Sequence, residues 1–286
     1  MSRHRSLPRA RSARTRQRLS QNFLTDAGAA RRIVRSAELR AGDLVLEIGP
    51  GDGMLTRHLL DVAGQIRAYE KDPFYVAKLR GRFAGEPRIR LFHTDFRAVR
   101  APAEPFAVVA NIPFGITTDI VRWCLKAPAL TSATLLTQYE FARKHSGDYG
   151  RWSKLTITHW PTVGMELGAR VRRDSFHPVP RVDAAVLRLR RRPSPLLPAA
   201  ALADYRRIVE LGFSGVGGSV ASSLRTRFPA RTVRAACRGA GIALDEPVGT
   251  VEPHRWLTLY RGLRDNCLRD RNVSDTFVYP TRKGGR

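Results

Sequence analysis

Short apolar runs alternate with amphipathic segments through the first half of the chain. The runs with the character of buried strands lie at residues 44–48, 66–70, 89–95, 106–111 and 133–138. Segments with helical spacing follow most of them, at residues 54–63, 73–83, 117–127 and 139–145. This alternation is typical of a parallel sheet with helices on both faces. The pattern therefore predicts an α/β fold, with a further helix at 26–36 ahead of the first strand.

Two more strand-like segments follow, at residues 156–171 and 182–190, with no helical spacing between them. Strands that are joined without a crossover helix pair in antiparallel fashion. We therefore expect a mostly parallel sheet of seven strands that ends in an antiparallel pair.

A charge run followed by three prolines, RRRPSPLLP at 190–198, marks the main domain boundary. Beyond it, helical spacing returns in short segments at residues 205–213, 221–228, 232–241 and 253–263. The sequence thus predicts a small, all-helical C-terminal domain. We expect a flexible basic arm, an α/β domain, the helical domain and a mobile tail, at residues 1–19, 20–192, 193–263 and 264–286.

The chain is strongly basic. Its 50 Lys and Arg residues against 25 Asp and Glu leave a formal net charge of +25. Such an excess favours a polyanionic partner, above all nucleic acid. A membrane surface is the alternative, but no basic amphipathic helix stands out, and the longest apolar run (LLPAAALA) is too short to span a bilayer. We therefore expect no membrane association.

The cysteines and histidines favour neither a disulfide framework nor a metal centre. Cys124, Cys237 and Cys267 form no Cys-x-x-Cys pair, and an odd number of isolated thiols fits a reducing compartment. None of the seven histidines has a partner at metal-ligand spacing. The Arg-rich start of the chain also resembles a mitochondrial presequence, but we prefer an arm that binds nucleic acid or a disordered tail. We expect a cytoplasmic protein without a metal.

The ends of the first three predicted strands carry residues suited to a nucleotide-like ligand. LEIGPGDG (46–53) ends a strand in a turn where Gly49 and Gly51 let a ligand approach the backbone. Glu70 ends the second strand and can grip both hydroxyls of a ribose, and Asp95 ends the third. Because these ends meet at one crevice, an adenosine-type ligand is favoured, although either carboxylate could instead cap a helix. Both a nicotinamide cofactor and S-adenosylmethionine fit such a crevice.

The fourth predicted strand ends in Asn111, Ile112, Pro113 and Phe114, and this turn discriminates between the two cofactors. The amine of adenine is a poor nucleophile because its lone pair is delocalised into the ring. The side-chain oxygen of Asn111 and the backbone carbonyl of Ile112 can hold both amine hydrogens out of the ring plane. Pro113 stiffens the turn, and Phe114 offers a face for an extruded base. The turn therefore indicates methyl transfer from S-adenosylmethionine to adenine, without a nucleophilic side chain.

In this order, EIGPGDG, YEKD, HTDF and NIPF resemble the motifs of class I, Rossmann-like methyltransferases that modify adenines in ribosomal RNA. SQNFL (20–24) and FHPVPRVDAAVLRL (176–189) are similar to motifs of the Erm family. That family methylates one adenine of 23S ribosomal RNA, in the peptidyl-transferase loop, and confers resistance to macrolides, lincosamides and streptogramin B. The resemblance implies a catalytic domain that binds S-adenosylmethionine at 20–192 and an RNA-binding domain at 193–263.

The resemblance also implies roles for single residues. The cofactor would be held by Asn22, Leu24, Gly49, Gly51, Glu70, Asp95 and Asn111. The target base would lie between the rings of Phe114 and Phe176, with its amine on Asn111 and Ile112. Two alternatives stay open, because Phe176 can instead anchor the proline-rich loop before the last strand and Asn22 can cap the following helix. Many relatives carry Tyr where this chain has Phe114, and stacking needs only the ring.

Basic residues near the predicted site suit RNA. Arg170, Arg172 and Arg173 precede Phe176, and phosphate contacts of this kind position RNA without reading its sequence. The stretch 213–224 is rich in Gly and Ser where several relatives carry a basic cluster, so the share of the helical domain in RNA binding is open. We expect a monomer that acts on large-subunit ribosomal RNA before the subunit is fully assembled.

Three other functions use a similar fold. Small-subunit (16S) ribosomal RNA dimethyladenosine transferases share QNFL and the glycine-rich turn, but carry NLPY where this chain has NIPF. A non-catalytic RNA-binding factor would not need two acceptors beside a sulfonium. A nicotinamide oxidoreductase would leave both NIPF and the net charge of +25 unexplained.

Overall fold

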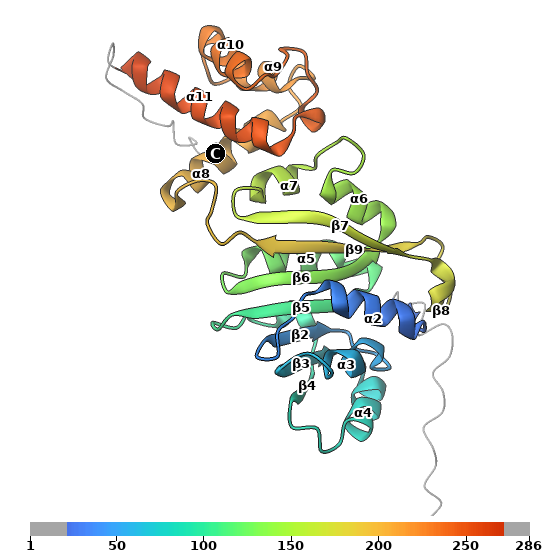
Figure 1. The fold of residues 1–286 in the computed structure, drawn as a ribbon. Coiled ribbons are helices and arrows are strands. Elements are labelled where there is room, and N and C mark those ends of the chain that lie inside the picture. The colour runs from blue at the N-terminus through green and yellow to red at the C-terminus, as the bar shows by residue number, and fades with distance from the viewer. Residues whose placement is uncertain (1–21, 272–286) are drawn as a thin grey trace, which may run out of the picture. The chain divides into compact units, whose positions relative to one another are not determined.

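A computed structural model describes residues 22–271 of the chain, with side chains as far as Asp265 (Figure 1). The basic arm expected at 1–19 lies outside the described residues, as does most of the tail expected at 264–286. The described chain contains an α/β part followed by helices, as the sequence predicts.

Seven strands form the main sheet, in the order β4-β3-β2-β5-β6-β9-β7. Their bounds are β2 Leu44–Ile48, β3 Gln65–Glu70, β4 Ile89–His93, β5 Phe106–Asn111, β6 Leu130–Gln138, β7 Val163–Val171 and β9 Ala184–Arg191. Neighbours from β4 to β6 are parallel, whereas β9 is antiparallel to both β6 and β7. The predicted class I methyltransferase sheet, mostly parallel with seven strands, is confirmed.

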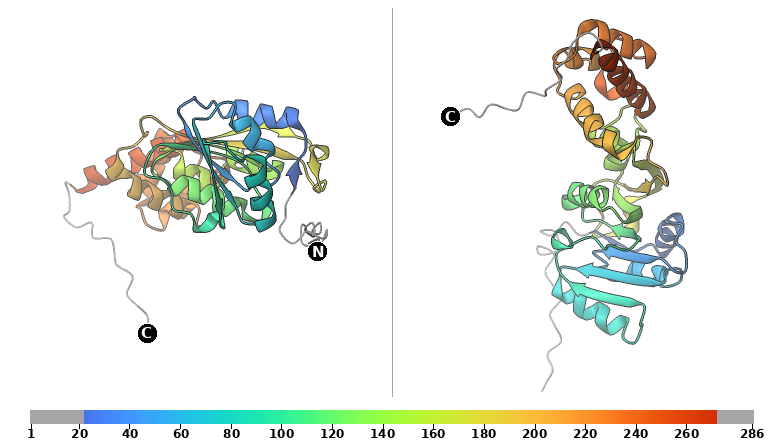
Figure 2. Two further views of the ribbon diagram at one scale, coloured as in Figure 1. Left: turned by 90° about the horizontal axis from the view of Figure 1, so that it is seen from below. Right: turned by 90° about the vertical axis from the view of Figure 1, so that its left-hand side faces the viewer.

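Helices cover both faces of this sheet, as the left view of Figure 2 shows. They are α2 Ala27–Ser36, α3 Met54–Leu59, α4 Pro73–Arg82, α5 Thr117–Lys126 and α6 Tyr139–Ser146. Two of these helices begin at an aspartate N-cap. The Asp26 carboxylate caps α2 by accepting the Ala29 N–H at 3.0 Å, and Asp72 caps α4 in the same way. On one face, α2 and α3 pack with inward side chains of the strands into one apolar core.

The segment at 156–171 differs from the prediction, because its first residues form a helix and not a strand. α7 spans Lys154–His159, and β7 begins at Val163. The Ser153 hydroxyl caps α7 by accepting a backbone N–H at 3.1 Å. Ile157 is fully buried in the apolar core of the helical part. The β-branched residues of this segment favour a strand locally, but tertiary packing overrides that preference.

A second, two-stranded sheet has no counterpart in the prediction. β1 (Phe23–Leu24) pairs antiparallel with β8 (Phe176–His177), and Leu24 lies opposite Phe176. Next to this pair, Thr25 donates its N–H to the Ser175 carbonyl at 2.8 Å. A strand this short shows no alternation of polar and apolar residues, so its pairing has no local signal.

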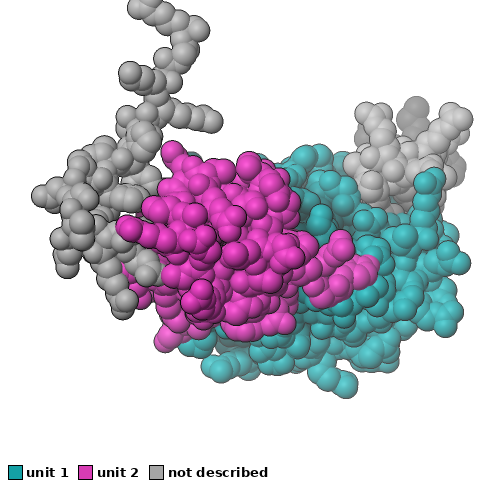
Figure 3. All heavy atoms as spheres, turned by 90° about the horizontal axis from the view of Figure 1, so that it is seen from above, with its two compact units in different colours: residues 1–148, 163–193 teal, residues 149–162, 194–286 magenta. Residues whose placement is uncertain are grey.

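The chain divides into two compact units, which Figure 3 colours separately. The first comprises residues 1–148 and 163–193, and the second comprises 149–162 and 194–286. The second unit contains α7 with α8 Ala199–Gly212, α9 Val220–Arg225, α10 Ala230–Gly239 and α11 Pro253–Arg271. Its core buries Trp256 and Tyr205, and the Tyr205 hydroxyl donates to the Ile157 carbonyl at 2.9 Å.

The observed boundaries differ from the expected ones in two respects. The chain enters the second unit twice, first for α7 and again after Pro193. In addition, α11 continues past Leu263, where the polar tail is expected to begin, as far as Arg271. Extending a helix from turns that are already packed adds one backbone hydrogen bond per residue, so the polar residues that follow can prolong it.

Candidate active site

A glycine-rich loop connects β2 to α3. Gly49, Gly51 and Gly53 have positive φ angles of 64°, 55° and 77°, a region that residues with a side chain rarely adopt. A Cβ atom on Gly51 would lie 2.7 Å from the ring of Phe23, so this position requires glycine for space as well. The Phe23 ring also contacts Tyr75, with ring centroids 4.9 Å apart. β1 therefore lies directly against the loop.

Glu70 ends β3, and its carboxylate holds the glycine-rich loop. Oε2 accepts the Gly51 N–H at 3.1 Å, and Oε1 accepts the Asp72 N–H at 2.8 Å. The residue is only 2% exposed, and this burial raises the pKa of the carboxyl against the opposing effect of the N–H donors. The structure thus brings Glu70 to the loop beside Gly51.

Asp95 follows β4 and has a different environment. The Arg97 guanidinium at 2.7 Å, and then the Lys71 ammonium at 2.9 Å, hold the pKa of its carboxyl well below the usual range. Asp95 also caps a 3-10 turn, η1 (Phe96–Ala98), by accepting the Arg97 N–H at 3.0 Å. The capping role that the sequence leaves open is therefore present. Asp95 is not among the residues that line the cavities described below.

Asn111, at the end of β5, is held in place by a hydrogen bond to Asn22. Its Nδ2 donates to the backbone carbonyl of Asn22 at 2.8 Å, which leaves Oδ1 as the acceptor that the amide presents. The next residue, Ile112, has a buried side chain, and its N–H donates to the Leu136 carbonyl at 3.1 Å. Pro113 faces the glycine-rich loop, because a Cβ on Gly49 would lie 4.0 Å from its Cδ.

Asn22 and Leu24 lie on either side of Phe23 in the segment that covers the loop. Asn22 approaches β5 through its carbonyl, and the cap of α2 is Asp26, so Asn22 does not take the capping role considered from the sequence. Leu24 is buried in the apolar core. Leu24 also lines a cavity beside the glycine-rich loop, and it pairs with Phe176 of β8.

Phe114 and Phe176 belong to the same apolar cluster but differ in exposure. Phe114 is half-buried and packs against the cluster from its edge. Phe176 is 2% exposed and is part of the cluster itself. A ring that stacks on a base has to present one face, and the Phe176 ring in this structure presents none. Its environment fits the anchoring alternative that the sequence leaves open.

Two small cavities, of about 30 Å³ and 20 Å³, lie next to the glycine-rich loop. Both are lined by Phe23, Gly49 and Asn111. The first is completed by Asn22, Gly51, Ile112, Pro113 and Phe114, and the second by Leu24, Glu47, Pro50, Asp52, Met54 and Leu55. The structure therefore gathers most of the predicted site residues, whereas Glu70 reaches the loop by hydrogen bonding and Asp95 and Phe176 lie outside these cavities.

Glu47 is a buried acid at this site to which the sequence analysis gives no role. It lies in β2, and its Oε2 accepts the Thr56 hydroxyl at 2.7 Å. Burial raises the pKa of Glu47 to about 8, so near neutral pH the side chain is largely protonated and uncharged. A signal for it exists in the sequence, because a lone Glu interrupts the apolar run LVLEI.

Within residues 22–271, no group of three or more His, Cys, Asp or Glu side chains is arranged to hold a metal ion. In the same part of the chain, no helix has the length and hydropathy needed to cross a membrane.

Comparisons with known proteins agree with this architecture. A family model described as ribosomal RNA adenine dimethylase matches residues 12–265. The chain is 48% identical to an rRNA adenine N-6-methyltransferase of Saccharopolyspora erythraea, over 90% of this chain and 68% of that protein. It is 36% identical to the mycinamicin-resistance protein MyrB of Micromonospora griseorubida, over 87% and 79% of the two chains. The crystal structure of the 23S rRNA methyltransferase ErmE is 49% identical with a TM-score of 0.82, over 85% of this chain and all (100%) of that one.

The fold and the glycine-rich loop together define a class I methyltransferase. The family model covers nearly the whole described region, and identities near one half extend across both compact units. The chain belongs to the ribosomal RNA adenine dimethylase family, in its Erm branch. The family predicted from the motifs is thus confirmed.

Proposed function

We propose that this protein transfers a methyl group from S-adenosylmethionine to the exocyclic amine of one adenine in 23S ribosomal RNA. The observation that carries the proposal is the position of the Asn111 amide. It is fixed by the Asn22 carbonyl at the end of β5 and lines a cavity with Gly49 and Phe114. Ribosomal RNA as the substrate is supported by the names of the relatives, an rRNA adenine N-6-methyltransferase and the 23S rRNA methyltransferase ErmE.

The residues around the glycine-rich loop suit S-adenosylmethionine, which supplies an electrophilic methyl group on a sulfonium. Gly49 leaves its backbone accessible, since the nearest atom to a Cβ there is 4.0 Å away. The buried Glu70 carboxylate next to the loop is the acceptor for ribose hydroxyls. Asn22, Leu24, Gly51, Asp95 and Asn111 complete the proposed set.

Binding of a molecule this large requires a local rearrangement. The two cavities beside the loop measure about 30 and 20 Å³, whereas sites for small molecules usually exceed roughly 300 Å³. Phe23 lines both cavities and covers Gly51. Movement of the Phe23 ring would therefore open the loop to the cofactor.

The target amine is activated by two acceptors, Asn111 Oδ1 and the Ile112 carbonyl. The bond from Asn111 Nδ2 to Asn22 fixes the rotation of the amide, and the buried side chain of Ile112 fixes its peptide group. Holding both amine hydrogens on these oxygens weakens the delocalisation of the lone pair, which requires a planar amine. S-adenosylmethionine would supply the methyl group: as the nitrogen bonds to the methyl carbon, the carbon–sulfur bond would break with its electron pair left on sulfur. The methylated amine would then release one proton to water.

Phe114 supplies the face on which the target base stacks, and we assign Phe176 to supporting it from the core. The half-buried Phe114 packs on the cluster that contains the buried Phe176. The sandwich of two rings that the family resemblance implies would require β8 to separate from Leu24 of β1.

The reaction is tested with labelled S-adenosylmethionine and protein-free ribosomal RNA from both subunits, followed by mapping of the modified nucleotide. We expect the label at one adenine of the peptidyl-transferase loop, and the mass of that nucleotide counts the methyl groups added. Label near the 3′ end of the small-subunit RNA would instead show the 16S activity. Absence of label from both RNAs, with Asn111→Ala as the background control, would refute the proposal.

The biological consequence proposed is resistance to macrolide, lincosamide and streptogramin B antibiotics. It is supported by the mycinamicin-resistance relative, which shares 36% of its aligned residues with this chain. Expression in a drug-sensitive bacterium should raise the inhibitory concentration of a macrolide, and expression of Asn111→Ala should not. We further propose a cytoplasmic monomer that acts on large-subunit RNA before full assembly. A lack of methylation of intact large subunits, compared with protein-free RNA, would support that order.

A further inference from the structure

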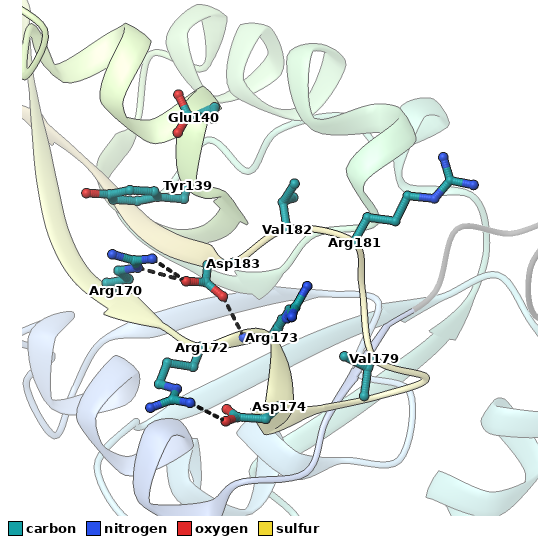
Figure 4. Close-up of a pocket in the computed structure, with 10 residues that line it drawn as sticks. All are labelled: Tyr139, Glu140, Arg170, Arg172, Arg173, Asp174, Val179, Arg181, Val182 and Asp183. Carbon is teal, nitrogen blue, oxygen red and sulfur yellow. Dashed lines mark hydrogen bonds and ion pairs between the residues drawn. The ribbon is translucent and has the colours of Figure 1, made fainter.

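A wide cleft lies beside the proposed active site, on the same compact unit (Figure 4). It measures about 890 Å³. Its wall comes from the start of α6, the end of β7 with the residues that follow it, and the loop between β8 and β9. The residues that line it include Tyr139, Arg170, Arg172, Arg173, Arg181 and Asp183, with the two apolar residues Val179 and Val182. We call it the arginine cleft.

The arginine cleft stands at the same edge of the sheet as Asn111. In the register of β5 and β6, Asn111 lies opposite Leu136, and Tyr139 follows three residues later. With about 3.3 Å per residue along a strand and about 4.8 Å between strands, Tyr139 lies on the order of 10 Å from Asn111. A nucleotide next to a target adenine inserted at Asn111 is therefore within reach of the cleft.

One arginine of the cleft is rigidly held. The Arg170 guanidinium donates from Nε and Nη2 to Asp183 Oδ2, at 2.9 and 2.5 Å, and lies 4.7 Å from the centroid of the Tyr139 ring. Asp183 also accepts the Arg173 N–H at 2.9 Å. The hydrogen bonds from the Arg173 N–H and then from the Arg170 guanidinium, which Figure 4 draws as dashed lines, hold the pKa of Asp183 below its usual range. The cleft wall is thus pre-organised around an ionised carboxylate.

Other arginines of the cleft retain charge for a ligand. Arg172 pairs with Asp174 at 3.0 Å, which offsets one charge. In the described part of the chain, the side chains of Arg173 and Arg181 make no ion pair within 4.0 Å, and both residues are exposed. Glu140 also lines the cleft, but Figure 4 shows it above Tyr139, away from Arg172 and Arg173. Within the described residues, Arg173 and Arg181 are therefore the cations of the cleft whose charge is not offset by an ion pair.

Apolar side chains stand beside these two cations. Val179 is 60% exposed and Val182 is 38% exposed, and both line the arginine cleft. Free guanidinium groups next to exposed apolar side chains match a single-stranded nucleotide, which has a phosphate for the cations and an unstacked base for the apolar surface. Double-stranded RNA keeps its base faces stacked and would offer only phosphates, sugar hydroxyls and base edges.

We infer that the arginine cleft binds a single-stranded nucleotide next to the target adenine. Its phosphate contacts Arg173 and Arg181, and its base lies on Val179 and Val182. Arg170 and Asp183 are positioning residues that shape the wall. This inference rests on the proposed function, because it takes the RNA strand to enter at Asn111. An acidic protein segment is the competing ligand, and the test below separates the two.

The first test measures binding, so that it does not depend on methyl transfer. The double variant Arg173→Ala/Arg181→Ala and the wild type are titrated with a labelled fragment of protein-free 23S RNA over a range of salt. We expect the Kd to rise about tenfold and the logarithmic salt slope to fall by about 0.7 for each lost phosphate contact. The matched control is Arg90→Ala, because Arg90 is exposed near the amino end of the edge strand β4, at the opposite edge of the sheet.

The second test locates the base. Abasic residues are placed one or two positions to either side of the target adenine, and affinity is measured for the wild type and for Val179→Ser/Val182→Ser. At one position, the wild type should bind the abasic RNA several-fold more weakly than the intact RNA. At that position the serine variant should bind the abasic RNA and the intact RNA with similar affinity. An equal effect of the abasic residue in both proteins at every position would overturn the base contact.

The outcomes separate this inference from the proposed function. If the wild type methylates 23S RNA and the double variant matches Arg90→Ala in Kd and salt slope, the cleft is not an RNA subsite. If the double variant loses polyglutamate binding as strongly as RNA binding, the cleft is a general anion surface, which also overturns the inference. If the wild type methylates no ribosomal RNA, the proposed function fails on its own.

Discussion

The glycine-rich loop near Asn111 and the arginine cleft share one edge of one sheet, yet they differ in size and in charge. The cavities beside the loop measure about 30 and 20 Å³, whereas the cleft measures about 890 Å³. Beside the loop, burial raises the pKa values of Glu47 and Glu70. At the cleft, hydrogen bonds from Arg173 and Arg170 lower the pKa of Asp183.

The difference follows from what each place has to do. Activation of an amine requires acceptors fixed in a site from which water is excluded, because hydrogen bonds there are not weakened by solvent. Capture of RNA requires exposed cations, whose field reaches through water and depends on salt. Two separate sites, the one at Asn111 and the arginine cleft, can meet these opposing requirements. The order of the strands in the sheet places the two sites next to each other.

The largest expected effect comes from removing the acceptor at the closed site. Asn111→Ala should lower kcat by at least about 100-fold, as the loss of a fixed group that acts on the reacting atoms does. Cofactor affinity should change by less than about tenfold, which corresponds to one hydrogen bond. RNA affinity should stay near that of the wild type, because the cleft is unchanged. Near-normal turnover in a single-turnover assay would disprove the acceptor role.

The next effect separates stacking from core packing. Phe114→Ala should lower kcat/KM for RNA by about 5- to 150-fold, the range for the loss of one aromatic stacking partner, and Phe114→Tyr should lose much less. Equal losses in the two variants would rule out stacking.

As a contrast, Phe176→Ala should cost about 3–5 kcal/mol of stability, because it empties a buried site. Urea unfolding measures that cost.

A smaller effect concerns the closeness of β1 to the glycine-rich loop. Gly51→Ala should destabilise the fold by about 1–2 kcal/mol through its positive φ alone, with more from the contact with Phe23. Gly81→Ala is the matched control, because Gly81 lies in α4 with no atom within 4 Å of a Cβ. That change should stabilise by about 0.5 kcal/mol. Equal thermal shifts in the two variants would show that the contact of Phe23 with Gly51 is unimportant.

Substitution of Glu47 is expected to have the smallest effect on methyl transfer, because this residue affects the stability of the fold. Its pKa of about 8 in the folded protein exceeds the usual 4.5, so the folded state binds a proton more tightly than the unfolded chain. The contribution of Glu47 to the free energy of unfolding is therefore fully present below pH 4.5 and is lost as the pH rises through about 8. Glu47→Gln keeps an acceptor for Thr56 and cannot ionise.

The glutamine variant should consequently lose less stability than the wild type over this pH range, as measured by urea unfolding at each pH. The difference between the two proteins isolates Glu47 from other titrating groups, such as Glu70. Parallel pH profiles for the two proteins would mean that Glu47 is charged in the folded state as well.

Local patterns predict much of this protein. The spacing of apolar residues predicts the sheet, and the turns at Gly49 and Asn111 appear at the strand ends where they are expected. The start of α2 is likewise local, since Asp26 accepts a hydrogen bond from a residue three positions away. These features depend on neighbours in the sequence, so a pattern a few residues long contains them.

Other features depend on partners far apart in the sequence. Asn111 is fixed by Asn22, 89 positions away, and Phe176 is covered because β8 pairs with β1. The β-branched segment of α7 becomes a helix because Ile157 is buried in the core of the second unit, among residues that come after residue 194 in the chain.

The sequence by itself thus determined the class of fold, the family and the chemistry of the turn at Asn111. Only the tertiary structure decided that Phe176 is buried, that Glu47 is neutral and that arginines from two segments form one cleft. The reason is physical. Burial and charge depend on everything that surrounds a side chain in space, and most of those surroundings come from elsewhere in the chain.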